Sequence, residues 1–206
     1  IGAVSPRGGD FSEPVTQNTK RFIRCFWALD KSLAYARHYP AIQWLSSYSE
    51  YIDDLTDWYK ENVSKDFMDK RSKIMAILQE ESSLLEIVKL IGADVLPDGQ
   101  KATLEVARAI RLGFLQQNAF HADDTYVPLE KQNKMMDVIL LLDRRMKEIV
   151  EKGIVFSKVN ETGIVEDVIR IKYTIGNKDM EAPFHELQRK INETFDNLIA
   201  QKLDED

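Results

Sequence analysis

The stretch 66–91 constrains the fold of this chain more than any other part of its 206 residues. Its apolar residues recur three and four positions apart, at Ile74, Ile77, Leu78, Leu85 and Val88. This spacing places them on one face of an amphipathic α-helix, and Gly92 can supply a left-handed cap where the pattern stops. A long helix with one apolar face needs other helices to cover that face, so the pattern predicts a helical bundle.

Other segments share this helical period. We expect further helices over 16–37, 49–62, 100–116, 129–152, 161–175 and 183–203. Pro40 forbids continuation of the first of these helices, and Pro128 suits the opening of the fourth. The segment 118–127 contains turn-forming and acidic residues without a period, so we expect an ordered loop there.

The first four residues form a short apolar run, Ile-Gly-Ala-Val, typical of a buried strand in a parallel sheet. A lone strand cannot be buried, so we interpret Ile1 as a cut made inside or just after a larger domain. No strand-like alternation of useful length follows Val4. The expected fold class is therefore mainly α: a C-terminal helical bundle preceded by a short strand and a loop.

Composition narrows the possible functions. The chain has 34 acidic and 28 basic side chains, a net charge of −6, which disfavours binding to a nucleic-acid backbone. One cysteine, Cys25, cannot form an intrachain disulfide and fits a reducing cytosol. Because Phe22, Phe26 and Leu29 lie near it in sequence, we expect Cys25 in the core. No apolar stretch approaches the ~20 residues that span a bilayer, so direct membrane insertion is not expected.

Patterns that carry catalysis or metal binding are missing from the sequence. The histidines His38, His121 and His185 lack any spacing that would aim two ligands from one helical face. Adjacent carboxylates point apart on a helix and are read as solvated: Asp53 with Asp54, Glu80 with Glu81, and Asp123 with Asp124. There is neither a nucleophile turn nor a phosphate loop of the form GxxxxGK(S/T). An independent helical enzyme therefore has little support.

Two runs, SPRGGDFSEPVTQ and FLQQNAFHADDTY, carry the strongest functional signal. Taken alone, each could be an ordinary loop, and its aromatics ordinary core residues. They occur in order with FWALDKSLAYARHYPAIQWLSSYSEY, a helix ending in LIGADV, and KATLEVARAIRLG. This set resembles the C-terminal part of the catalytic A chain of A-type and V-type rotary ATPases, over roughly residues 1–146. The family has a second proline where this chain has Arg7.

The resemblance implies a division of the chain and a site. Residues 1–40 would be the end of a truncated P-loop nucleotide-binding domain, with its strand, loop and long helix, and 41–206 the helical bundle domain. In this family, ATP or ADP binds with Mg²⁺ on the P-loop domain while adenine enters an aromatic pocket. The matching adenine-side positions are Tyr39 and Phe120, with Gln116 and Gln117 as polar contacts. Without the phosphate-binding part, we expect at best about millimolar affinity and no ATP turnover.

The resemblance also implies partners. In the family, catalytic A and non-catalytic B subunits occupy alternating places in a hexamer around a central rotor stalk, a cytoplasmic, peripheral membrane complex that couples ATP chemistry to ion movement. The acids expected to lie nearest the rotor are Asp10, Glu13, Asp94 and Asp98. The alternative is a non-catalytic helical interaction module on the same scaffold. Because Phe22, Phe26, Trp27 and the strand 1–4 would normally pack on the missing domain, we expect this chain to self-associate.

Overall fold

A computed structural model describes residues 1–205, and the side chains of residues 1–203. In these residues the elements are η1 (Arg7–Gly9), α1 (Pro14–Lys20), β1 (Cys25–Phe26), α2 (Lys31–Tyr35), β2 (Tyr48–Ser49), α3 (Tyr51–Asn62), α4 (Phe67–Ile91), α5 (Asp98–Ala109), η2 (Ile110–Leu115), α6 (Ala122–Thr125), α7 (Leu129–Glu151), α8 (Ser157–Thr162), α9 (Ile164–Ile169), α10 (Ile171–Thr174) and α11 (Glu181–Glu205). The mainly α fold class is thus confirmed.

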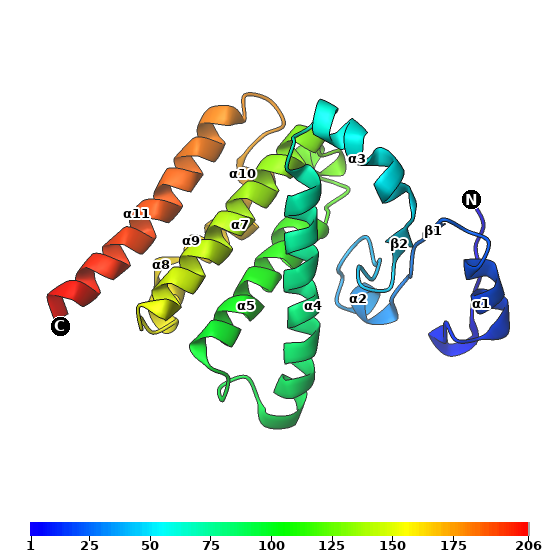
Figure 1. The fold of residues 1–206 in the computed structure, drawn as a ribbon, viewed down its shortest axis with the longest axis horizontal. Coiled ribbons are helices and arrows are strands. Elements are labelled where there is room, and N and C mark those ends of the chain that lie inside the picture. The colour runs from blue at the N-terminus through cyan, green and yellow to red at the C-terminus, as the bar shows by residue number, and fades with distance from the viewer. Residues whose placement is uncertain (206) are drawn as a thin grey trace.

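The bundle is built around α7. Helices α11, α7, α5 and α4 lie next to one another in Figure 1, with the small N-terminal part at the opposite side from α11. Their facing sides supply the core, which includes Leu78, Val106, Ile110, Val138, Leu142, Met146, Ile191 and Phe195. Fully burying an aliphatic or aromatic side chain of this size stabilises the fold by ~1.5–3 kcal/mol. Packing of these apolar faces therefore holds the long helices together.

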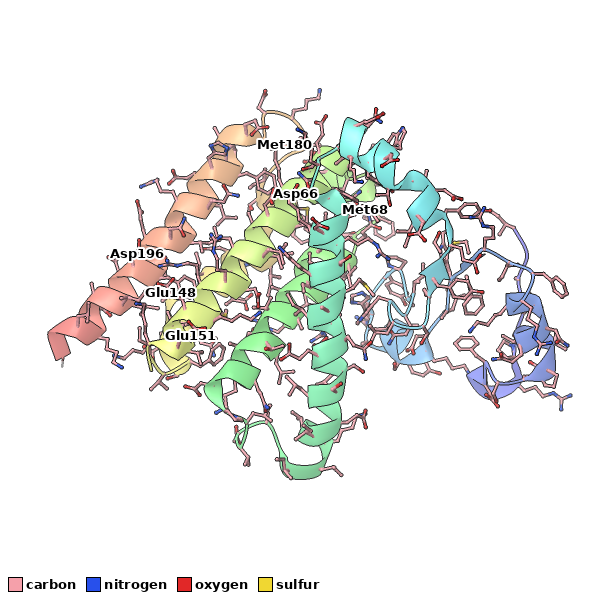
Figure 2. All side chains as sticks on the ribbon, viewed as in Figure 1. Asp66, Met68, Glu148, Glu151, Met180 and Asp196 are labelled. Atoms are coloured by element: carbon pink, nitrogen blue, oxygen red, sulfur yellow. The ribbon has the colours of Figure 1, made fainter. Side chains whose placement is uncertain are left out.

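Ion pairs tie the outer helices to α7. Arg145 of α7 contacts Glu148, at 2.8 Å, and Asp196 of α11. Figure 2 shows Asp196 on α11 and Glu148 on α7 where the two helices run beside each other. At the other end of the bundle, the largely buried Lys70 of α4 lies 2.7 Å from Asp137 of α7 and 3.0 Å from Asp66. These contacts link α11 and α4 to α7.

The prediction of a single helix over 16–37 is wrong. Helix α1 ends at Lys20, Cys25–Phe26 pairs antiparallel with Tyr48–Ser49, and a new helix, α2, begins at Lys31. The side chain of Asp30 caps α2, because its Oδ1 accepts the Leu33 N–H at 2.9 Å. A capping aspartate starts a helix and does not continue one, so the helical spacing on either side of Asp30 belongs to two separate helices.

The environment of Cys25 also differs from the expectation. Successive side chains of a strand point to opposite faces. Phe26 points inward against Phe11 and Tyr48, with ring centroids 5.6 and 5.9 Å apart, while Cys25 and Trp27 are exposed. Cys25 is therefore not a core residue, and Phe26 packs within this chain. The strand expected over residues 1–4 is likewise absent, since these residues have no regular structure.

The expected helix over 161–175 is divided into three short helices. Gly163 ends α8 with a left-handed φ of 71°, and α9 and α10 follow with a break at Arg170. By contrast, α3, α4, α7 and α11 match the expected helices to within a few residues. Gly92 does end α4, but with φ 86° and ψ 159° it is not in the left-handed helical region.

The helical conformation changes at the C-terminal end of α5, just before the loop 116–121. Helix α5 continues as the π-helix η2, in which Gly113 lies against the backbone of α9. A Cβ at Gly113 would be 3.0 Å from Ile169 Cα, so any side chain here would press on the backbone of α9. None of the helices described is both long and apolar enough to cross a membrane.

Candidate functional site

Two loops that are about eighty residues apart in sequence meet at the side of the bundle. The Gln117 N–H donates to the Tyr39 carbonyl at 2.7 Å. Beside it, the Gln116 side-chain amide donates to the Arg37 carbonyl at 3.2 Å. The fold thus joins the backbones of the two segments that carry the four expected adenine-side residues.

The two aromatic side chains of these loops are exposed. Tyr39 is 54% exposed and Phe120 is fully exposed. The Phe120 N–H donates to Asn118 Oδ1 at 3.0 Å, which forms a local turn in the loop. The whole Phe120 ring is in contact with water, on the same side of the bundle as the half-exposed Tyr39 ring. Both rings are available to stack on a planar ligand.

The π-helix η2 positions the second loop. The Gln116 N–H donates to the Arg111 carbonyl at 2.9 Å at the end of η2, and Gln116 itself has an extended backbone conformation. Single π-turns inside helices occur frequently at functional sites, because the extra residue re-aims the chain that follows. Here Gln116 and Gln117, which follow η2, are directed toward the segment that contains Arg37 and Tyr39.

A buried polar cluster lies directly beneath the loop. Lys131, Lys172 and Asp124 are each at most 2% exposed. The pKa of each lysine is lowered by burial, which the negative charge of Asp124 partly offsets. The expectation that Asp124 is solvated is therefore wrong. Sequence reasoning missed this cluster because single charged residues in a polar stretch look like surface residues.

His38 is also buried beside the site. Its ring lies 5.6 Å from that of Trp44, and its pKa is lowered by burial and by the positive charges of Arg111 and Lys172. His121 packs edge-on against Tyr173 at 5.0 Å. No group of three or more metal-ligating side chains gathers anywhere in the described part of the chain.

The four acids expected near a rotor lie in two separate places. Asp10 and Glu13 precede α1, whereas Asp94 and Asp98 lie at the turn between α4 and α5, and Figure 1 shows these segments apart. Asp10 is exposed, and hydrogen bonds from Ser12 lower its pKa. Asp98 has a structural contact, since its Oδ2 accepts the Phe156 N–H at 2.9 Å. A rotor-facing role for these acids stays a prediction.

The turn between α4 and α5 borders a cleft of about 430 Å³ that also touches α8. Its wall contains paired charges: Arg108 with Glu105 at 2.7 Å, and Arg111 with Glu81 at 2.9 Å. Glu81 is buried, which raises its pKa, so the expectation that it is solvated is wrong. Because these charges are already paired with one another, they offer little attraction to a further ion.

Comparisons with known proteins agree with the resemblance. Residues 56–159 match the family described as the C-terminal domain of V and A type ATP synthase, and residues 1–49 match the nucleotide-binding domain of the ATP synthase alpha/beta family. The two matches are separated by residues 50–55, and the domain boundary expected at residue 40 stays a prediction.

Individual relatives extend the match toward the C-terminus. The chain is 55% identical over 98% of its length to a V-type ATP synthase alpha chain of Clostridium tetani, and 49% identical over 98% of its length to the corresponding A-type ATP synthase chain of Methanopyrus kandleri. It spans about a third, 34%, of each of these relatives. A solved ATP synthase subunit from Nanoarcheaum equitans shares the fold, with a TM-score of 0.53 at 23% identity over 65% of this chain and 31% of that one. The chain belongs to the V- and A-type ATP synthase family and corresponds to the C-terminal part of its alpha chain, also called A.

Proposed function

We propose that this part of the chain forms the adenine side of the nucleotide pocket in the catalytic alpha chain of a rotary ATP synthase. The observation that carries the proposal is the hydrogen bond from the Gln117 N–H to the Tyr39 carbonyl, which joins the two aromatic loops. Tyr39 and Phe120 supply ring faces for the purine. Gln116 and Gln117 supply polar contacts at the same place.

Stacking on Tyr39 and Phe120 can supply only part of the affinity for a nucleotide. Stacking of a base on an aromatic side chain is worth roughly 1–3 kcal/mol, whatever the base. Most nucleotide affinity comes from backbone amides and a lysine that contact the phosphates, and this sequence has no phosphate loop. The 206-residue chain should therefore bind ATP or ADP at about millimolar strength, roughly −4 kcal/mol, and should not hydrolyse it.

Within the whole alpha chain, Mg²⁺ and the phosphates would bind on the P-loop domain. Three such chains would alternate with B subunits in a hexamer of a peripheral complex on the cytoplasmic side of a membrane, and the complex would couple ATP chemistry to ion movement. The names of the relatives, V-type and A-type ATP synthase chains, support this assignment. Asp10 and Asp94 are exposed and accessible to a rotor stalk, as the family assignment predicts for their loops.

Truncation of the aromatic side chains tests the proposal. In the complete complex, Phe120→Ala and Tyr39→Ala should each raise KM for ATP by about 5- to 150-fold, the equivalent of 1–3 kcal/mol. The value of kcat should change little, because stacking is the same in the ground state and the transition state. The matched control is Tyr126→Ala, which removes a 77% exposed ring six residues from Phe120.

The alternative, a non-catalytic interaction module on this scaffold, predicts a different result. If neither variant changes KM for ATP or nucleotide affinity beyond the Tyr126→Ala control, the adenine-side assignment is wrong. The chain would then serve assembly alone.

A further inference from the structure

Lys172 has a position that its sequence context does not explain. It lies on the short helix α10, and its side chain is 2% exposed. Its Nζ donates to the Gln116 carbonyl and lies 3.8 Å from Asp124 Oδ2. Burial of an ammonium group is costly unless it is paired and hydrogen-bonded, so these two contacts explain how the charge is tolerated.

Asp124 contacts the same loop at Asn118. Its Oδ2 accepts the Asn118 N–H at 2.6 Å, a charge-assisted hydrogen bond. The ion pair therefore holds both neighbours of Gln117: it binds the carbonyl of Gln116 and the amide of Asn118. Gln117, between them, donates its own N–H to Tyr39.

A second layer of contacts keeps the ion pair in place. Lys131 Nζ donates to the Lys172 carbonyl at 3.3 Å and to Asn177 Oδ1 at 3.0 Å. The Asn177 side-chain amide in turn donates to the carbonyls of Asp123, at 3.1 Å, and Tyr126, at 2.8 Å. Helices α6, α7 and α10 are thus linked by hydrogen bonds under the loop, and the loop cannot move without breaking buried polar contacts.

We propose that Lys172 and Asp124 are positioning residues that hold the loop 116–120 in the conformation that presents Gln116 and Phe120 to the nucleotide. A loop that is ordered before binding loses less conformational entropy when its ligand arrives, so the clamp improves affinity without touching the ligand. The nucleotide part of this statement rests on the proposed function, whereas the clamping of the loop does not. The inference gives α10, which lies beyond the matched family domain, a role in the site.

Amide hydrogen exchange of the 206-residue chain without nucleotide tests the clamp. In Lys172→Met, the Gln117 and Asn118 amides should exchange at least about tenfold faster, because the Gln116 carbonyl loses its buried donor. Core amides of α4 and α7 should keep their wild-type rates. The matched control is Lys190→Met, which removes an exposed lysine that pairs with Asp167 at 2.6 Å, away from the loop. Loop exchange within about twofold of wild type in folded Lys172→Met would overturn the proposal.

Lys172→Met leaves the Asp124 carboxylate buried without its cation, and the variant could unfold. In that case the exchange experiment uses the double variant Lys172→Met with Asp124→Asn. The double variant leaves neither charge unpaired and keeps an acceptor for the Asn118 N–H. For the double variant too, Gln117 amide exchange at least about tenfold faster than wild type would support the clamp, and exchange within about twofold of wild type would overturn it.

Steady-state kinetics of the complete complex distinguish a positioning role of Lys172 from a role in stability alone. Lys172→Met should raise KM for ATP several-fold with kcat within about twofold of wild type, and Lys190→Met should leave both unchanged. An unchanged KM despite faster loop exchange would contradict the positioning role. If Phe120→Ala also leaves KM unchanged while Lys172→Met loosens the loop, then the proposed function fails and the clamp itself stands.

Discussion

Gly113 is the position where a single methyl group most directly tests the packing beneath the site. A Cβ built there lies 3.0 Å from Ile169 Cα and 3.3 Å from both the Ile169 and Val168 carbonyl oxygens. Nonbonded carbon atoms prefer separations of about 3.5–4.0 Å, so α9 would have to move away by a few tenths of an ångström. All three neighbours are backbone atoms of a helix, which cannot rotate aside as a side chain could.

Two opposing terms set the size of the effect. Alanine is favoured over glycine inside a helix by roughly 1 kcal/mol. Forcing an extra carbon into a packed interior costs typically about 1–3 kcal/mol. We take the upper part of that range because all three obstructing atoms belong to the backbone of α9. Gly113→Ala should therefore lower the free energy of unfolding by about 1–2 kcal/mol, which at this chain length shifts Tm by about 2–8 °C.

Gly99, at the start of α5, provides the control. A Cβ there meets only Val150 Cγ1, at 3.7 Å, an ordinary contact with a side chain. Gly99→Ala should leave stability unchanged or raise it by up to about 1 kcal/mol. Thermal and urea unfolding followed by circular dichroism measure both variants. If Gly113→Ala unfolds at or above the wild-type temperature, the close approach of η2 and α9 does not constrain this position.

Two further predictions concern pH and association. The lowered pKa of His38 means that the unfolded chain takes up a proton near pH 6.5 while the folded chain resists it, so stability should fall as the pH drops below about 6.5. His38→Gln should flatten that part of a curve of unfolding free energy against pH, and coinciding curves would refute the assignment to His38. Phe22 and Trp27, 87% and 66% exposed, should promote self-association of the chain. Sedimentation should show concentration-dependent association that Phe22→Ser with Trp27→Ser reduces, and a strict monomer would contradict this.

Prediction from sequence succeeded where a long local pattern decides the outcome. Helices α4 and α7 each repeat apolar residues at helical spacing over several turns, and glycines lie at or just beyond their ends. Of the apolar face expected for α4, Ile74, Ile77 and Leu78 are buried, whereas Leu85 is 40% exposed. The pattern failed between 16 and 37, where apolar spacing on both sides of Asp30 suggested one helix. There a cap and the pairing of Cys25–Phe26 with a distant strand outweigh local propensity.

For the candidate site, the resemblance predicts Tyr39 and the QQNAF segment, and the structure shows how these two segments contact each other. The bond between Gln117 and Tyr39 joins residues about eighty positions apart, which no local period encodes. The burial of Asp124 and Lys172 was missed because burial depends on which distant segment covers a residue. A lone lysine has the same sequence appearance whether it is solvated or enclosed.

The sequence by itself determined the helical class, the long helices and the chemistry of the exposed rings, because periodicity and aromatic character are local properties of the chain. Tertiary structure decided which loops meet, which charges are buried and how the π-turn at Gly113 directs the loop that follows. These depend on contacts between segments far apart in the chain, where desolvation and hydrogen-bond geometry fix the energy of each group.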